Sequence, residues 1–179
     1  MYVPEEVERV LFTREQLDER VKQLGEQLTR DYEGRSPLFL CVLRGAVVFF
    51  SDLIREVRCP LTVDFIRTQS YNGTESSGTV EVDLMKVGDI SGRDVVIVED
   101  ICDSGRSLVE INKALGAMKP RSLKTVVLLD KPSRRAVEFE PDYTGFVIDD
   151  LFVIGSGFDC DSRFRNLPYI GIYKSISGD

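Results

Sequence analysis

Residues 95–108 read "VVIVEDICDSGRSL", and this stretch decides the class of fold. The apolar run over 95–98 is continuous rather than alternating, which predicts a strand over 94–98 that is buried on both faces of a sheet. Glu99 and Asp100 follow at the end of that strand, and a third acid, Asp103, comes shortly after. Adjacent carboxylates beside a buried strand are costly without partners, so these acids indicate a site for a polar ligand.

The next residues, "DSGRS" (103–107), form a polar loop before an expected helix over 107–119. Gly105 permits a tight turn in which successive N–H groups point inward at a helix N-terminus, where an anion is favoured. Ser107 and Glu110 have the spacing of a capping box for the same helix. Neither the Walker pattern nor the dinucleotide fingerprint is present. From spacing alone, a phosphate site and an ordinary capped turn both remain open.

Short apolar strands and helices alternate along the rest of the chain. A helix is expected over 13–32, with Thr13 and Gln16 as its capping box, and another over 47–57. Further strands are predicted over 37–43, 61–71, 79–87, 123–130, 144–149, 152–155 and 169–176. The run over 79–87 alternates, as an edge or antiparallel strand does. This order predicts one α/β domain over 1–179, with a mostly parallel sheet covered by helices on both faces.

The carboxyl ends of the predicted parallel strands are the expected place of the site, because ligands of such sheets bind there. Three loops leave such ends, at 43–46, 99–107 and 130–135, and we expect them to gather around one ligand. Residues 72–78 are polar and glycine-containing, with no core anchor, and are expected to form a mobile loop.

Composition excludes several classes of function. The formal charge is −7, with 30 acids against 23 bases, which argues against a general nucleic-acid or anionic-membrane binder. There is no histidine and no C-x-x-C pair, so a zinc site and an imidazole mechanism are not expected. "MYVPEEVERVLF" has no signal-peptide pattern, and no window approaches the roughly 18 apolar residues of a membrane span. We interpret the four cysteines as reduced thiols of a cytoplasmic protein: Cys41, Cys59, Cys102 and Cys160.

The segment "VVIVEDICDSGRS" resembles the phosphoribosyl-diphosphate (PRPP) motif of type I phosphoribosyltransferases, in which an apolar strand, two acids and an acid-small-glycine loop follow one another. Four more segments resemble the hypoxanthine-guanine phosphoribosyltransferase family in the same order: "LCVLRGAVVFF", "VDFIRTQSY", "LLDKPSRR" and "LFVIGSGFD…RFRNLPYIG". The resemblance covers about residues 10–173. Ala46, where a second glycine is common, and Arg106, at a variable position, depart from the family pattern without removing a functional group.

The resemblance implies the type I phosphoribosyltransferase fold, a central mostly parallel sheet flanked by helices, with a small hood built from about 1–15 and 150–179. It also implies a lid over about 70–80, with Ser70 and Tyr71 at its start, that excludes water during the reaction. A homodimer or homotetramer is expected.

Roles for the PRPP-binding residues follow from the same resemblance. It assigns the ribose hydroxyls and nearby magnesium ligation to Glu99 and Asp100, with Asp159 as a ligand of a second Mg²⁺. The 5′-phosphate is assigned to Asp103, Ser104, Gly105, Arg106 and Ser107. The pyrophosphate is assigned to Leu43, Arg44, Gly45 and Arg165. The Leu43–Arg44 peptide can be cis in the family.

The purine site is implied in the same way. Asp103 is the implied acid/base for the proton on purine N7, and Lys131, a pure donor, selects a 6-oxo group over the amino group of adenine. Phe152 is the implied stacking aromatic, Val153 contacts the base edge through its backbone, and Asp159 lies near the base. Without the resemblance, these positions read as a turn cap, a surface lysine, a core phenylalanine and a turn aspartate.

The implied reaction is transfer of the 5-phosphoribosyl group from PRPP to N9 of hypoxanthine, and of guanine, giving IMP or GMP and pyrophosphate in purine salvage. Mg²⁺ is the expected cofactor, and neither nucleic acid nor membrane is an expected partner. Two alternatives stay open: an enzyme for another base such as xanthine or uracil, and a non-enzymatic PRPP sensor that binds nucleic acid. The charge of −7 disfavours the sensor.

Overall fold

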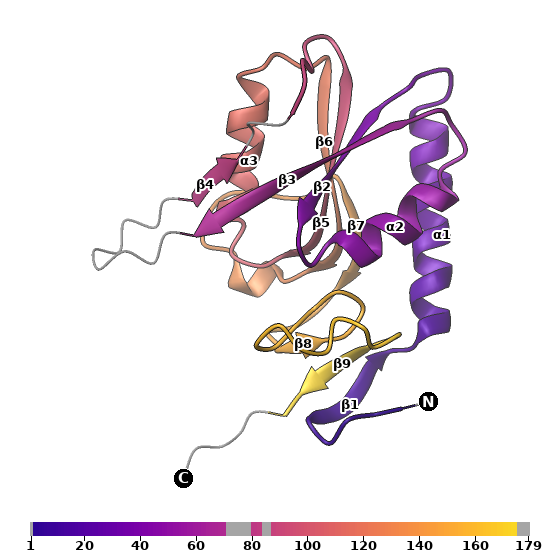
Figure 1. Ribbon diagram of the computed structural model, residues 1–179, viewed down its shortest axis with the longest axis vertical. Coiled ribbons are helices and arrows are strands. Elements are labelled where there is room, and N and C mark those ends of the chain that lie inside the picture. Colours follow the sequence, from indigo (N-terminus) through magenta and orange to yellow (C-terminus); the bar gives the residue numbers. More distant parts are fainter. Residues whose placement is uncertain (1, 71–79, 84–86, 175–179) are drawn as a thin grey trace.

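The computed structural model describes residues 2–70, 80–83 and 87–174. Its main sheet has the strand order β4-β3-β2-β5-β6-β7 (Figure 1). Five of these strands are parallel, and the edge strand β4 is antiparallel to β3. The strands are β2 Leu38–Leu43, β3 Thr62–Ser70, β4 Val80–Asp83, β5 Asp94–Cys102, β6 Ser122–Asp130 and β7 Tyr143–Val147. The predicted α/β class and the antiparallel edge strand are confirmed.

Helices cover both faces of this sheet, which explains the continuous apolar runs in its central strands β2, β5 and β6. On one face lie α1 (Arg14–Asp31) and α2 (Val47–Glu56), and on the other lies α3 (Arg106–Gly116) (Figure 1). In β2 the side chains of Phe39 and Cys41 pack toward α1 and α2. The alternate side chains of Leu40 and Val42 pack toward α3. A strand with both faces buried cannot show the polar alternation of a half-exposed strand.

The start of α1 follows the predicted capping box. The Gln16 amide N–H donates to Thr13 Oγ1 at 3.4 Å, and the Thr13 amide N–H donates to Gln16 Oε1 at 2.9 Å. The predicted box at Ser107 is wrong. The helix α3 begins at Arg106 with Gly105 as its N-cap, at φ 81°, and no side chain caps it. Because the left-handed turn at Gly105 starts the helix at Arg106, Ser107 lies inside the first turn and cannot be the N-cap.

Strand β5 is longer than its apolar run indicates. It continues to Cys102, so Glu99 and Asp100 lie on the strand and not in the loop after it. The pairing of Glu99 with Val127 and of Cys102 with Asp130 carries β5 alongside β6 to the end of both strands. The main-chain pairing of β5 therefore holds the acidic pair.

A second sheet of order β1-β9-β8 lies beside the carboxyl ends of the main sheet (Figure 1). Its strands are β1 Val7–Phe12, β8 Val153–Ile154 and β9 Ile170–Tyr173, and β9 is antiparallel to both neighbours. It joins the two ends of the described chain, where the hood is expected. The strand predicted over 152–155 is shorter in the structure, and Phe152 precedes it.

At the amino ends of the central strands, opposite the candidate site, a buried carboxylate pairs with a half-exposed arginine. The Asp94 side chain is fully buried at the start of β5, where both carboxylate oxygens accept hydrogen bonds from Arg121. Ser122 Oγ donates to Asp94 Oδ1 at 2.6 Å. The bonds from Arg121 lower the pKa of Asp94 to about 2, although burial acts in the opposite direction, and the bond from Ser122 adds to the lowering. The pair ties the beginnings of β5 and β6 together, far from the acidic loop.

Candidate active site

The loop after β5 is fastened to the segment after β6 by main-chain hydrogen bonds. The Lys131 amide donates to the Cys102 carbonyl at 2.9 Å, and the Ala136 amide donates to the Ser104 carbonyl at 3.0 Å. Arg135 Nη1 donates to the carbonyls of Cys102, at 3.0 Å, and Asp103, at 2.5 Å. The carbonyls of this loop therefore face the segment after β6, and the two loops form one unit.

A cavity of about 210 Å³ lies at this loop. The predicted phosphate loop and the acidic pair line the same cavity: Glu99, Asp100, Ile101, Cys102, Asp103, Ser104, Gly105, Ser107 and Leu108. Arg106 is exposed, and its amide lies 3.5 Å from Ser104 Oγ. The cavity ends at the N-terminus of α3, where unpaired amides and the helix dipole favour an anion.

Glycine is required at position 105 for two reasons. Its φ of 81° is a conformation that side chains disfavour. A β-carbon there would stand 2.9 Å from Arg135 Cδ and 3.1 Å from Val137 Cγ2. The close packing of Arg135 and Val137 behind Gly105 thus fixes the shape of the phosphate loop.

Glu99 and Asp100 form a half-buried carboxylate pair. The Asp100 amide donates to Glu99 Oε1 at 3.0 Å. Burial, and then the charge of Asp100, raise the pKa of Glu99 well above its ordinary value. Burial also raises the pKa of Asp100, although the bond with Glu99 and the positive charge of Arg165 oppose that shift. Such a pair favours hydroxyl donors or a cation beside it.

Gly45 brings a second loop against this pair. A β-carbon at position 45 would stand 1.7 Å from Asp100 Oδ2 and 3.4 Å from Arg165 Nη1. The peptide before Arg44 is cis, as the family resemblance allowed. Gly157 lies equally close, because a β-carbon there would stand 2.3 Å from the Gly45 carbonyl oxygen. Loops after β2 and β8 therefore meet β5 at one place.

Arg165 and Asp159 are joined at this meeting point. Arg165 Nη2 lies 2.6 Å from Asp159 Oδ1, and Arg165 Nη1 donates to the Gly157 carbonyl at 2.6 Å. The Ser162 amide donates to the other oxygen of Asp159 at 2.8 Å. These contacts hold the guanidinium beside Gly45 and Asp100, where the pyrophosphate is expected.

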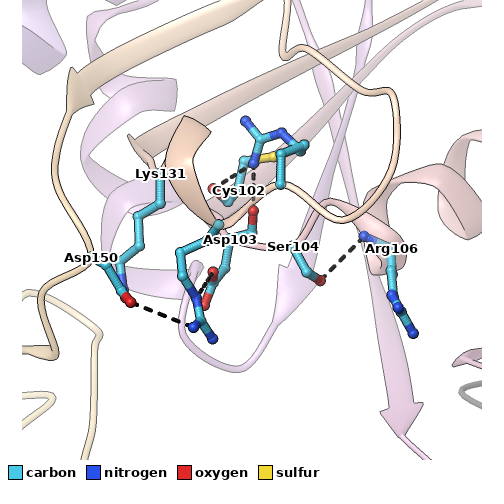
Figure 2. Close-up of polar contacts among 8 residues, drawn as sticks. Cys102, Asp103, Ser104, Arg106, Lys131 and Asp150 are labelled. Atoms are coloured by element: carbon cyan, nitrogen blue, oxygen red, sulfur yellow. Dashed lines mark hydrogen bonds and ion pairs between the residues drawn. The ribbon is translucent and has the colours of Figure 1, made fainter.

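Lys131, the predicted base selector, lies near Asp103 (Figure 2), whereas Asp159, also predicted near the base, lies with Arg165. The Lys131 side chain is 8% exposed, and its Nζ lies 3.9 Å from Asp150 Oδ1. Figure 2 shows Lys131 and Asp150 side by side, next to Asp103. Arg134 lies between the two acids, with Nε 3.3 Å from Asp103 Oδ1 and Nη1 3.4 Å from Asp150 Oδ2. The structure thus brings the predicted acid/base and the predicted base selector into one cluster.

Phe152 is not a core residue, contrary to what its apolar surroundings indicate. It is 54% exposed, and its ring meets only the edge of Tyr173 among the aromatic pairs of the described residues, at 5.5 Å. Val153 is buried in β8. Ser70 is the last residue of β3, and Tyr71, with most of the predicted lid, lies outside the described residues.

Three residues at the site were not predicted from the sequence: Arg134, Arg135 and Asp150. The basic run in "KPSRR" and the acidic pair in "IDD" were the available signals. Neither signal is periodic, and exposed charges next to a turn are common, so the run alone could not have separated a site residue from a surface residue.

Comparison with known proteins identifies the family. Residues 13–163 match the phosphoribosyl transferase domain family. The chain belongs to this family. The hypoxanthine-guanine phosphoribosyltransferase of Lactococcus lactis is 46% identical over 169 residues, which cover 94% of this chain and 92% of that one. A solved hypoxanthine phosphoribosyltransferase of Staphylococcus aureus has a TM-score of 0.90 at 42% identity, with 94% and 92% of the two chains covered.

One group of relatives of this phosphoribosyltransferase is much longer. The bifunctional protein TilS/HprT of Listeria monocytogenes is 46% identical over 170 residues, and the match covers 94% of this chain but 26% of that protein.

Among the described residues, no helix has the length and apolar character that crossing a membrane requires.

Proposed function

We propose that this phosphoribosyltransferase transfers the 5-phosphoribosyl group from PRPP to N9 of hypoxanthine, and of guanine, releasing pyrophosphate. The observation that carries the proposal is the convergence of three loops: the cavity at residues 99–108, the Gly45–Arg165 contact and the Lys131–Asp103 cluster lie around the same strand end. A phosphate, a sugar, a pyrophosphate and a purine need four adjacent subsites, and each has residues of matching chemistry there.

The reaction needs stabilisation of a departing pyrophosphate and of an oxocarbenium-like ribosyl group, with inversion at C1′. In this proposal Arg165, which lies next to Gly45, binds pyrophosphate oxygens through its guanidinium, and the backbone at Gly45 approaches the same oxygens because it has no side chain. The amides of the loop before α3 hold the 5′-phosphate. Binding both ends of PRPP holds C1′ in place for attack by N9.

The base subsite supplies recognition and a proton acceptor. The buried Lys131 ammonium donates to a 6-oxo oxygen and cannot accept from the amino group of adenine. The exposed ring of Phe152 offers a face on which a purine stacks, worth about 1–3 kcal/mol for a base on an aromatic ring. Asp103 accepts the proton that the purine releases at N7, through a carboxylate beside the base.

Magnesium fits the acidic pair. Burial raises the pKa of both Glu99 and Asp100, so a cation beside them would stabilise their charged forms, and oxygen ligands are those that Mg²⁺ prefers. The described residues contain no cluster of three or more metal-ligating side chains, so substrate oxygens and water would complete the coordination. We propose Glu99 and Asp100 as ligands of one Mg²⁺ and Asp159 as a ligand of a second. When bound, the metal neutralises pyrophosphate charge.

The cellular setting is part of the same proposal. All four cysteines are free, which supports a reducing cytoplasm. We propose a homodimer or homotetramer in solution, and light scattering after gel filtration tests it by giving a mass of two or four chains of 20.2 kDa.

The experiment for the proposed reaction follows hypoxanthine consumption with PRPP, with and without Mg²⁺. We expect IMP and pyrophosphate in equal amounts when Mg²⁺ is present. With EDTA in excess, the rate falls by more than about 100-fold, because the pyrophosphate loses its counter-charge. An unchanged rate in EDTA contradicts the metal proposal, while absence of IMP in both conditions contradicts the reaction.

A further inference from the structure

Two neighbouring arginines hold Asp103 by different atoms. Arg135, whose side chain is 14% exposed, donates to the Asp103 carbonyl and to the Asp130 carboxylate. These bonds fix the main chain of Asp103 but leave its carboxylate free to rotate. Arg134 contacts that carboxylate, with Nε 3.3 Å from Oδ1. Main chain and side chain of the same residue are therefore fixed separately.

Arg134 is itself held in place by the backbone. It is the last residue of η1 (Pro132–Arg134), a single helical turn that starts directly after Lys131. The Arg134 amide donates to the Lys131 carbonyl at 3.0 Å, and the Arg135 amide donates to the Pro132 carbonyl at 3.2 Å. The turn therefore connects Lys131, the proposed base selector, to Arg134, whose side chain reaches Asp103, the proposed proton acceptor.

The guanidinium links two acids that come from different strands. Asp103 follows β5 and Asp150 follows β7, and Arg134 lies 3.3 Å from the first and 3.4 Å from the second. Asp150 in turn lies 3.9 Å from Lys131 Nζ. Positive and negative charges alternate along the row Lys131, Asp150, Arg134, Asp103. Figure 2 labels Lys131, Asp150 and Asp103 of this row.

We propose that Arg134 is a positioning residue for the transfer: it orients the Asp103 carboxylate toward N7 and couples it, through Asp150, to base recognition at Lys131. This inference rests on the proposed function, in which Asp103 accepts the proton. An isolated exposed ion pair contributes little, but a pair that sets the angle of a reacting group acts on the rate through geometry. Arg134 does not touch the reacting atoms.

Arg14, the first residue of α1, offers a matched control outside the candidate site. It also bridges two acids, with Nε 2.8 Å from Asp18 Oδ1 and Nη1 3.5 Å from Asp52 Oδ2. Its side chain is 43% exposed, close to the 53% of Arg134. Removing either guanidinium should therefore change the stability of the fold by a similar amount. Of the two arginines, only Arg134 lies at the candidate site.

The test is a double-mutant cycle of Arg134→Gln and Asp103→Asn, read as the single-turnover rate of IMP formation at saturating PRPP and hypoxanthine. We expect Arg134→Gln alone to slow this rate by about 10-fold. The KM for PRPP, measured separately by steady-state kinetics, should stay within about two-fold of wild type, because orientation and not binding is lost. In the Asp103→Asn background the same change should slow it by less than about two-fold, because no acceptor remains to be oriented. Arg134→Lys should restore part of the rate, and Arg14→Gln should leave it unchanged.

Each other result has a distinct meaning. If Asp103→Asn is slow and Arg134→Gln is as fast as wild type, the positioning role is overturned while the role of Asp103 stands. If the two effects multiply, Arg134 acts on something other than Asp103 and the inference is overturned as well. If Asp103→Asn itself is fast, the proposed role of Asp103 fails, and the inference with it. Wild-type IMP formation separates all three results from failure of the proposed reaction.

Discussion

The carboxylate of Asp100 occupies the place that a β-carbon on Gly45 would need, since Oδ2 would stand 1.7 Å from that atom. The contact joins the loop after β2 to the acidic strand β5 and brings Arg165 within 3.4 Å of the same point. Glycine at position 45 is therefore a condition for the proposed ribose and pyrophosphate subsites to lie together.

Gly45→Ala should displace the Asp100 carboxylate and lower kcat/KM for PRPP by about 100-fold, as misplacements near 1 Å do. Steady-state kinetics with PRPP as the varied substrate measures this. Gly116→Ala is the control, because a β-carbon at position 116 meets no atom within 4 Å, and its kinetics should match wild type. Full activity of Gly45→Ala would show that catalysis does not depend on the position that the Asp100 carboxylate takes beside Gly45.

Lys131→Gln should lower kcat/KM for hypoxanthine by about 10- to 100-fold, the worth of one hydrogen bond from a charged donor. An amide oxygen accepts from an amino group, so discrimination against adenine should narrow at the same time. IMP and AMP formation, compared by chromatography, give the ratio. Lys124→Gln, at the other end of β6 and paired with Asp142, should keep the wild-type ratio. Equal loss for both bases would contradict a selecting role.

Asp94→Asn tests the ion pair between the buried Asp94 carboxylate and Arg121, far from the site. The pKa of Asp94 is about 2 in the folded chain against an ordinary 3.8, so its ionised form stabilises the fold above about pH 4. That contribution is lost as the pH falls from about 4 to about 2. At about 1.4 kcal/mol per pH unit, and reduced because Arg121 is 58% exposed, it amounts to about 1–2 kcal/mol.

Urea unfolding of Asp94→Asn at pH 7 should show this loss in the free energy of unfolding, and the difference from wild type should shrink toward pH 2. The exposed Asp161→Asn should stay within about 0.5 kcal/mol of wild type. A difference for Asp94→Asn that is independent of pH would mean that its charge is not the cause.

Phe152→Ala should raise KM for hypoxanthine by about 10-fold or more, because stacking on the ring is lost. The ring is 54% exposed, so the melting temperature should change little. Kinetics with hypoxanthine as the varied substrate, together with thermal unfolding, separate the two effects. A large fall in melting temperature with unchanged KM would return Phe152 to a purely structural role.

Much of the architecture could be predicted, because its signals are local. The continuous apolar runs of β2, β5 and β6 predicted a sheet buried on both faces, and Thr13 with Gln16 predicted where α1 begins. The three loops expected at the carboxyl ends do meet. The acidic pair and Gly105 could be singled out because each is costly or unusual without a ligand.

Features that depend on distant partners could not be predicted. The strand β1 pairs with β9 from the other end of the described chain, and a short mixed segment such as "VERVLF" shows no sign of that. The extension of β5 through Glu99 depends on its pairing with β6. The bridge formed by Arg134 depends on the positions that β5 and β7 give to Asp103 and Asp150. In the sequence, Arg134 is visible only as part of a short basic run.

Transfer of the phosphoribosyl group to 6-oxopurines is tested most directly by incubating the protein with PRPP and Mg²⁺ and one base at a time. The bases are hypoxanthine, guanine, xanthine and adenine, and the nucleotide formed from each is measured. We expect rapid formation of IMP, formation of GMP, and no AMP. No nucleotide from any purine, despite tight binding of PRPP, would contradict this expectation and would favour a protein that senses PRPP without transferring its sugar.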